Sequence, residues 1–248
     1  MQGLIDIHCH IIPGVDDGAH TIHEAALMLK SEYQNGVEAI ILTPHYRSGM
    51  FETSQEQVEK QFHKVWKLTR RSRSGMRVYL GCEYHTNRNM VADLNAEKRP
   101  TMAGSRYVLT EFSSMHGYET IRNQVYELIA AGYKPIVAHA ERYPCLLKQP
   151  DLVRELIDLG AKIQITAGSI LGHDGWRMKQ FCWKLLKKKQ VDFIASDMHD
   201  LEERGCRLKE CAEILEKKFG SQYVEQIMRR NPRKIIVEGR KNTSRESH

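Results

Sequence analysis

Seven short apolar runs are spaced along the chain and predict β-strands. They cover residues 4–7, 39–42, 78–80, 107–109, 135–138, 163–166 and 193–195. Short runs rich in isoleucine, valine and leucine, bounded by polar or turn-forming residues, are typical of strands. The runs therefore predict a sheet at the centre of the protein.

Amphipathic stretches between the runs predict helices. The clearest cover residues 118–131, 152–159, 177–189, 205–219 and 222–230. Two helix starts carry pairs with the spacing of a capping box, Thr21 with Glu24 and Thr53 with Glu56. Strands that alternate with helices form parallel sheets. We therefore expect an α/β fold, a TIM-like (β/α)7 barrel, with an open doubly wound sheet as the alternative.

The length of the chain suits one domain of this class. A chain of 248 residues can form a single α/β barrel, and no repeat or low-complexity linker divides it. We expect one domain over residues 1–239, followed by a polar, disordered tail over residues 240–248. No apolar run approaches the roughly 18 residues that span a bilayer, and the N-terminus has no signal-peptide pattern. A cytoplasmic protein without membrane insertion is the expectation.

The cysteines and the net charge indicate which kinds of site and partner to expect. The six cysteines form no CxxC pair, which favours reduced thiols over a zinc knuckle or a disulfide framework. The formal net charge of +6 is spread over helix faces. This pattern favours an ordinary solvated surface, with attraction to an acidic or phosphorylated partner as the alternative. We expect no nucleic-acid partner.

Six of the seven runs end at residues that can bind a metal. In chain order these residues are His8 and His10, His45, Glu83, Glu111, His139, and Asp197 with His199. In barrels of alternating strands and helices, the carboxyl ends of the strands meet on one face. The glycine-flanked turn at residues 14–18 returns a carboxylate toward the same face. Separately, a histidine pair can be structural and a turn can be a helix start, but together these residues predict one shared pocket.

The predicted ligands are imidazoles and carboxylates without thiolates, which suits manganese, iron or zinc. The full set is His8, His10, Asp17, His45, Glu83, Glu111, His139, Asp197 and His199. Nine ligands exceed the needs of one ion and are enough for two or three. Such clusters activate water at neutral pH and hold the attacking and leaving oxygens of a displacement at phosphorus. Hydrolysis of a phosphate ester is the reaction that this ligand set predicts.

Two arginines follow the ligand motifs and strengthen the phosphate hypothesis. Arg142 comes three residues after His139, and Arg204 comes five residues after His199. A guanidinium can pair with two phosphate oxygens at once. Either arginine alone fits a surface salt bridge equally well, so their value lies in their position beside the predicted ligands.

Four motifs together resemble a known family. Residues 6–18 (DIHCHIIPGVDDG), 43–45 (TPH), 139–142 (HAER) and 196–199 (SDMH) are similar to the motifs of the PHP (polymerase and histidinol phosphatase) metal-dependent phosphoesterases. Within them, the chain resembles the CpsB/YwqE group of bacterial protein-tyrosine phosphatases over residues 3–239. This resemblance implies the PHP fold, a distorted barrel of seven strands.

The resemblance also implies a site and a substrate. It implies three divalent ions with manganese as the usual activator (iron, zinc or magnesium are alternatives), the nine ligands above with Asp17 rather than Asp16, and Arg142 and Arg204 as phosphate-binding arginines. The implied substrate is the tyrosine-rich tail of a bacterial tyrosine kinase that controls capsule or exopolysaccharide synthesis. The chain departs from the family at Ala140, where proline is common, and at Cys82, where glutamine is common.

Three other functions compete with this hypothesis. A small-molecule phosphoesterase, such as a histidinol-phosphate phosphatase, is the main alternative. A non-catalytic adaptor is disfavoured because the ligand set is complete. Cys82 and Arg88 have the cysteine-x5-arginine spacing of thiol-based tyrosine phosphatases, but Glu83 places a negative charge where such a loop must bind phosphate.

Four tyrosines near the motifs, Tyr46, Tyr84, Tyr118 and Tyr143, are candidates to line a tyrosine slot. Packing in the core is the alternative for at least half of them.

Overall fold

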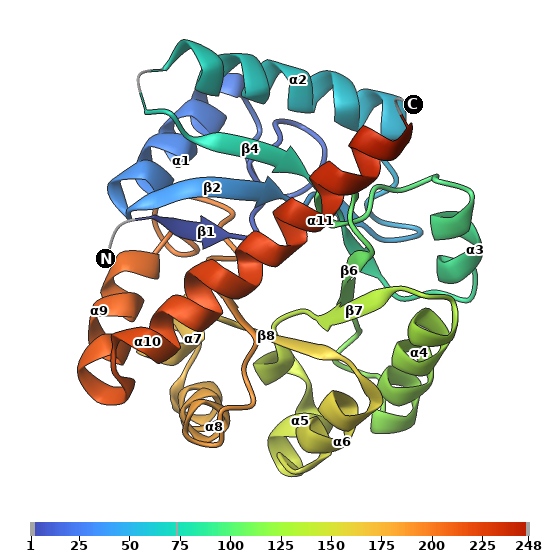
Figure 1. Ribbon diagram of the computed structural model, residues 1–248, viewed down its shortest axis with the longest axis vertical. Coiled ribbons are helices and arrows are strands. Elements are labelled where there is room, and N and C mark those ends of the chain that lie inside the picture. The colour runs from blue at the N-terminus through green and yellow to red at the C-terminus, as the bar shows by residue number, and fades with distance from the viewer. Residues whose placement is uncertain (1–2, 73, 247–248) are drawn as a thin grey trace.

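Parallel β-strands form the centre of the computed structural model, which describes residues 3–72 and 74–246 (Figure 1). The strands are β1 (Leu4–Asp6), β2 (Val37–Leu42), β3 (His45–Tyr46), β4 (Arg77–Leu80), β5 (Glu83–His85), β6 (Tyr107–Glu111), β7 (Lys134–Val137), β8 (Lys162–Thr166) and β9 (Phe193–Ala195). Short interruptions separate β2 from β3 and β4 from β5. Each of the seven predicted runs therefore corresponds to one strand or to one interrupted strand.

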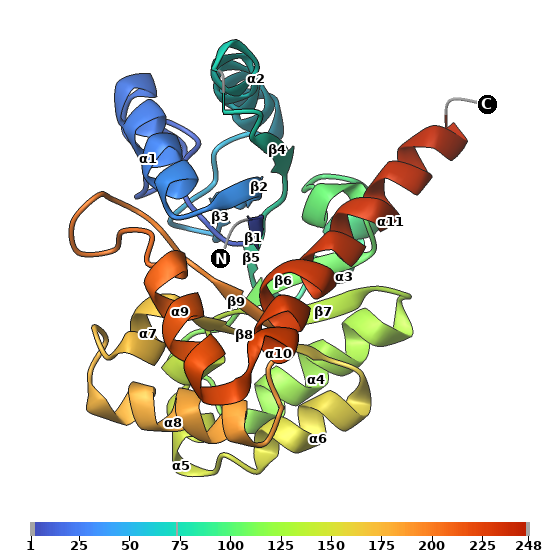
Figure 2. The ribbon, with the colours of Figure 1, turned by 60° about the vertical axis from the view of Figure 1, so that its left-hand side comes forward.

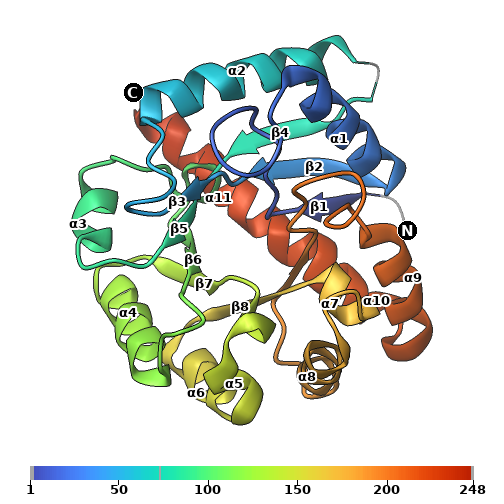
Figure 3. The same ribbon diagram turned by 180° about the vertical axis from the view of Figure 1, so that it is seen from behind.

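The strands close into a barrel. Their order is β1-β2-β4 in one sheet and β3-β5-β6-β7-β8-β9 in the other, and every ladder is parallel. A parallel bridge between Cys9 and Met198 joins the chain after β1 to the chain after β9. The loops that follow these two strands lie side by side in Figure 3. The prediction of a distorted (β/α)7 barrel is confirmed, and the open sheet is excluded.

Alternation along the strands separates the inside of the barrel from its outer wall. One buried cluster fills the interior and includes Ile5, Ile7, Ala39, Ile41, Leu109, Ile136, Ala138 and Phe193. Alternate residues such as Leu4, Ile40 and Ile194 belong to a larger cluster that packs under the helices. Side chains of a strand point to opposite faces in turn, so the same short run supplies both layers.

Helices cover the outer wall (Figure 2). They are α1 (Ile22–Gln34), α2 (Gln55–Arg71), α3 (Met90–Asn95), η1 (Met102–Gly104), α4 (Tyr118–Ala130), η2 (Ala140–Arg142), α5 (Pro144–Lys148), α6 (Leu152–Leu159), α7 (Ala167–Leu171), α8 (Trp176–Lys187), α9 (Leu208–Phe219), α10 (Ser221–Glu225), the π-helical η3 (Gln226–Arg230) and α11 (Asn231–Glu246). Helix α11 runs diagonally across the molecule in Figure 1, and its Ile235 and Ile236 close the barrel interior. In the part of the chain described here, no helix has both the length and the hydrophobicity that crossing a bilayer requires.

Only one of the two predicted helix caps is confirmed. The Thr21 hydroxyl accepts a hydrogen bond from the Glu24 amide and caps α1, as its spacing predicts. The prediction for Thr53 is wrong by one residue, because Ser54 takes the cap position of α2. The Thr53 hydroxyl instead donates a 2.8 Å hydrogen bond to the carbonyl of Val15. A tertiary contact has therefore displaced the local motif.

The predicted tail at residues 240–248 also differs from the structure, because α11 continues to Glu246. The Arg240 guanidinium donates a 2.6 Å hydrogen bond to the Tyr79 hydroxyl and lies 5.7 Å from the centre of that ring. Asn242 donates to the carbonyl of Gly104. These contacts hold the helix on the barrel beyond residue 239, whereas Ser247 and His248 lie outside the described residues.

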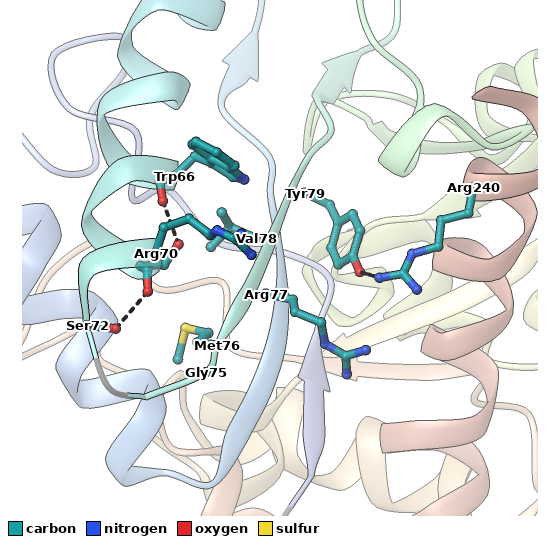
Figure 4. A pocket seen from close by; sticks show the side chains of 10 residues that line it. Trp66, Arg70, Ser72, Gly75, Met76, Arg77, Val78, Tyr79 and Arg240 are labelled. Atoms are coloured by element: carbon teal, nitrogen blue, oxygen red, sulfur yellow. Dashed lines mark hydrogen bonds between the residues drawn. The ribbon is translucent and has the colours of Figure 1, made fainter. Parts of the chain in front are cut away.

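The Arg240–Tyr79 contact closes one side of a groove on the barrel wall (Figure 4). The groove has a volume of about 370 Å³ and is lined by residues of α2, β4 and α11, among them Trp66, Arg70 and Arg77. It lies apart from the residues that the sequence nominates for chemistry.

Candidate metal centre

The structure brings all nine predicted ligands together at the carboxyl ends of the strands. Three overlapping groups have ligand atoms within 4.8 Å of one another: His10, Asp17, His45 and His199; His8, His10, Glu83 and Asp197; and His45, Glu83 and Glu111. His139 joins them, because its Nε2 lies 2.8 Å from Oε1 of Glu83. Residues from the first to the last strand thus share one pocket, as the barrel topology predicts.

Strand alternation places His8 and His10 on the same face. Both imidazoles are buried, and their Nε2 atoms lie 3.2 Å apart. Asp6, which precedes them by one alternation, accepts hydrogen bonds from the amides of His8 and Ser196 instead. Within four residues, from Asp6 to His10, the chain therefore changes from a side chain that supports the backbone to side chains that can bind a metal.

Glu83 is the most connected residue of the cluster. Its Oε2 lies 3.1 Å from Nε2 of His8, 3.3 Å from Nε2 of His10 and 2.8 Å from Nδ1 of His45. Burial favours the neutral acid, but the imidazoles of His8 and His45 hold the pKa of Glu83 well below its usual value. Burial and the neighbouring charge of Glu83 raise the pKa of Glu111 to about 7. The carboxylate of Glu83 is therefore in the charged form that metal binding requires.

The two neighbouring carboxylates after β1, Asp16 and Asp17, have different surroundings. Asp17 has Oδ1 3.5 Å from Nε2 of both His45 and His199, so it faces the cluster. Asp16 is turned away, with Oδ2 2.7 Å from Nδ1 of His10 and 3.0 Å from the amide of His45. Gly18 permits this turn, because a Cβ there would overlap the backbone of His10. The geometry agrees with the choice of Asp17 over Asp16 as the candidate ligand.

Gln164 is a site residue that the sequence patterns missed. It lies in β8, the strand that ends without a ligand, and its Oε1 is 3.1 Å from Nδ1 of His8 and 2.9 Å from the amide of His139. A partner at Nδ1 fixes the ring so that the other nitrogen faces the metal. The available signal was a glutamine inside an apolar strand, since a buried amide needs hydrogen-bond partners.

The two predicted arginines meet on one carboxylate. Arg142 lies 2.7 Å and Arg204 lies 2.9 Å from the same oxygen, Oδ2 of Asp197. Burial raises the pKa of Asp197, but Arg142 and His8 outweigh it and hold the pKa well below its usual value. The arginine side chains are 29% and 38% exposed, so both guanidiniums border the solvent at the mouth of the site.

Two of the candidate ligands have a strained backbone. His139 and Asp197 have positive φ angles of 30° and 53°, a conformation that non-glycine residues seldom adopt. Such conformations persist where the surrounding structure enforces them, and they are common at functional sites. Burial, with the nearby charge of Arg142, lowers the pKa of His139 to about 4, so its imidazole is neutral as metal binding requires.

Unpaired polar atoms in the cluster fit bound cations. Five buried atoms of the predicted ligands lack a hydrogen-bond partner within the described residues: His45 Nδ1, Glu83 Oε2, Glu111 Oε2, Asp197 Oδ1 and His199 Nε2. Buried polar atoms without partners are costly, and native proteins avoid them. Several lie close together without hydrogen-bond geometry, as ligands around a shared cation do. Nitrogen and oxygen donors suit manganese, iron or zinc.

The alternative thiol chemistry does not fit the structure. Cys82 is buried, and burial raises the pKa of its thiol to about 12, so it holds no thiolate at neutral pH. Arg88 is exposed three residues beyond the end of β5. The cysteine and the arginine therefore do not form a phosphate-binding loop.

The four tyrosines near the motifs differ in exposure. Tyr84 and Tyr143 are buried, with hydroxyls hydrogen-bonded to Asp93 and to the amide of Phe112. They serve packing. Tyr46 and Tyr118 are partly exposed and remain candidates for contact with a substrate ring.

Comparison with known proteins identifies the family. A family model described as "Capsular polysaccharide synthesis, CpsB/CapC" matches residues 4–237. The chain is 33% identical over 240 residues to the tyrosine-protein phosphatase CpsB of Streptococcus pneumoniae, covering 95% of this chain and 99% of that protein. It is 32% identical over 219 residues to the tyrosine-protein phosphatase YwqE of Bacillus subtilis, covering 88% and 86% of the two chains.

A solved structure agrees with these relatives. Crystal structures described as those of YwqE and CpsB, "unique metal-dependent tyrosine phosphatases", include a chain that superposes with a TM-score of 0.89. That chain is 30% identical, and the match covers 95% of each chain. The protein therefore belongs to the CpsB/CapC family of capsular polysaccharide synthesis.

Proposed function

We propose that this protein is a metal-dependent protein-tyrosine phosphatase that acts in capsule or exopolysaccharide synthesis, on the phosphorylated tail of a bacterial tyrosine kinase. One observation carries the chemistry: nine residues with nitrogen or oxygen ligand atoms converge beside two arginines that border the solvent. The similarity to CpsB and YwqE supports phosphotyrosine as the substrate.

The three overlapping groups of candidate ligands, with His139 beside Glu83, would hold the divalent ions. His10, His45 and Glu83 each belong to two of the groups, so the groups form one continuous cluster. Manganese is the proposed resident ion, and iron, zinc or magnesium are the alternatives. Divalent ions in such a centre supply a nucleophilic water at neutral pH and neutralise negative charge that develops at phosphorus.

Arg142 and Arg204 bind the phosphoryl group in this proposal. Their guanidiniums remain charged at any physiological pH and present paired donors that match phosphate oxygens. Their shared contact with Asp197 holds both at the same side of the pocket, so they approach one phosphoryl group together. A departing tyrosine phenolate has a pKa of about 10 and needs less help from an acid than an alkoxide does.

A cytoplasmic location fits the thiol chemistry. In the described part of the chain, all six cysteines carry free thiols, and five of them are buried. Proteins of oxidising compartments more often carry disulfides. We therefore propose that the protein acts on the cytoplasmic side of the membrane.

Phosphate release tests the function. The protein is stripped with a chelator, reloaded with manganese, and incubated separately with phosphotyrosine peptides and with histidinol phosphate. We expect release from the peptides, dependent on the added metal. Release from histidinol phosphate alone would instead support the small-molecule alternative.

A matched pair of variants links the activity to the centre. His199→Ala removes a candidate ligand, and we expect it to abolish release. His23→Ala removes an exposed histidine of α1 and serves as the control. Equal activity of the two variants would contradict the proposed centre.

A further inference from the structure

A groove runs between α5 and α8. Its volume is about 510 Å³, and its lining includes Pro144, Lys148, Trp176, Arg177 and Lys184. Figure 3 shows the two helices as neighbours at the lower edge of the molecule. The groove is distinct from the metal cluster, whose ligands do not line it.

The chain connects this groove directly to the candidate site. Arg142 is the last residue of η2, and Pro144 begins α5 two residues later. Helix α8 packs against both η2 and α5, so one helix borders the groove and supports the turn that carries Arg142. The groove therefore starts, along the chain, two residues after the arginine that is proposed to bind the phosphoryl group.

The groove is positively charged. Lys148, Arg177 and Lys184 are exposed, and none of them forms an ion pair with any residue in the ranges 3–72 and 74–246. All three line the same groove. Their joint field favours an anionic ligand.

An exposed aromatic side chain, Trp176, also lines the groove. Trp176 is 72% exposed at the start of α8, while Phe181 of the same helix is buried in the core. Because most of this indole is exposed to water, it does not contribute the free energy of folding that its burial would give. Tryptophan and arginine are enriched in the centres of protein interfaces, where they act as anchors.

Another hollow, which two of the candidate ligands line, has the opposite charge. This second hollow, of about 500 Å³, is lined by Asp17 and His199 together with Glu24, Glu202 and Glu203. An acidic peptide segment is repelled there and attracted along α5 and α8. This asymmetry gives a bound peptide one preferred direction.

We propose that the groove between α5 and α8 binds an acidic segment that flanks the phosphotyrosine of the protein substrate. The proposal rests on the proposed phosphatase function and assigns substrate selection to Lys148, Trp176, Arg177 and Lys184. Carboxylates of the segment pair with the three cations, and Trp176 packs on its backbone or on an apolar side chain.

Two phosphotyrosine peptides of equal length test the proposal, one with glutamates flanking the tyrosine and one with glutamines. Wild-type protein loaded with manganese is expected to favour the glutamate peptide in kcat/KM by about tenfold at low ionic strength. The double variant Lys148→Glu/Lys184→Glu is expected to reduce this ratio to about one. Trp176→Ala is expected to raise KM for the glutamate peptide by about threefold or more.

The matched control is Lys217→Glu/Lys218→Glu, which makes the same change of charge at two exposed lysines of α9. We expect it to keep the tenfold ratio. An equal ratio for both peptides with wild-type protein, or the same loss in groove and control variants, would overturn the proposal.

Fluorescence anisotropy separates this proposal from the proposed function. A fluorescein-labelled, unphosphorylated glutamate peptide reports binding whether or not phosphate is released. Turnover of both peptides without preference contradicts the groove but leaves the phosphatase intact. Binding that the groove variant weakens, in a protein that releases no phosphate from either peptide, contradicts the phosphatase function instead.

Discussion

The carboxylate of Asp16 lies 2.7 Å from Nδ1 of His10, which leaves Nε2 of His10 facing Glu83 and Asp197. Burial works against the charge of Asp16, but His10 holds its pKa below the usual value. A charged partner behind an imidazole fixes the ring and raises its basicity toward a metal. Asp16 thus supports the centre without facing it.

Replacement of this carboxylate tests its role. We expect Asp16→Asn to lower the affinity for manganese by about 10- to 100-fold, because the amide holds the imidazole less firmly. Calorimetric titration of metal-free protein measures the affinity. Asp158→Asn, which changes an exposed carboxylate on α6, is the control. An affinity of Asp16→Asn within twofold of wild type would show that the contact does not support metal binding.

The arginines allow a prediction that separates phosphate binding from metal binding. We expect Arg142→Ala and Arg204→Ala each to lower kcat/KM for a phosphotyrosine peptide by about 10²- to 10³-fold, the typical loss when a donor to transition-state charge is removed. The metal content of both variants, measured by atomic emission, is expected to stay unchanged. Loss of metal together with activity would indicate that the arginines act through Asp197 alone. Arg154→Ala, on an exposed helix face, is the control.

Cys82 gives a prediction of no effect. We expect Cys82→Ser to keep activity within about twofold of wild type, because burial keeps the thiol protonated and the chemistry depends on the metal ligands. Steady-state kinetics on the same peptide measures this. Near-total loss of activity in a variant that circular dichroism shows to be folded would restore the thiol mechanism.

Glu32 predicts how stability depends on pH. It is fully buried on α1, and burial and the neighbouring Asp6 raise its pKa well above 4.5, although Cys206 donates to it. The folded state then retains a proton that the unfolded state loses above pH 4.5, so this group makes stability fall as pH rises toward the raised pKa. We expect Glu32→Gln to flatten this fall and to stabilise the protein by about 1–3 kcal/mol near pH 8.

Denaturant unfolding between about pH 5 and about pH 9 measures this effect. Glu38→Gln changes a carboxylate that is 45% exposed and paired with Arg77, so we expect little change there. A fall in stability that is equally steep in wild type and Glu32→Gln would contradict the prediction.

The sequence was sufficient for the barrel because each strand carries its own signal. Short runs such as residues 193–195 are apolar throughout, and the ligands follow them directly, so strand topology alone brings His8 near Asp197. No long-range knowledge was needed to place these two residues on one face.

Features that depend on contacts between distant segments were not predictable in this way. The Thr53 hydroxyl prefers the carbonyl of Val15 to the cap of its own helix, and α11 persists past residue 239 because Arg240 meets Tyr79. Gln164 lies in the middle of a strand, and its value arises only from its contacts with His8 and His139. Short sequence patterns do not indicate which distant residue a side chain will contact.

The packing of Ile235 and Ile236 beside Ile5 and Ile7 has a consequence for how this protein is made. Because the interior needs both β1 and α11, a nascent chain on the ribosome cannot complete its core until residue 236 has emerged. Contacts between such distant segments are slow to form. Until then, apolar side chains of the barrel interior are exposed to solvent. Exposed apolar surface of this kind favours aggregation.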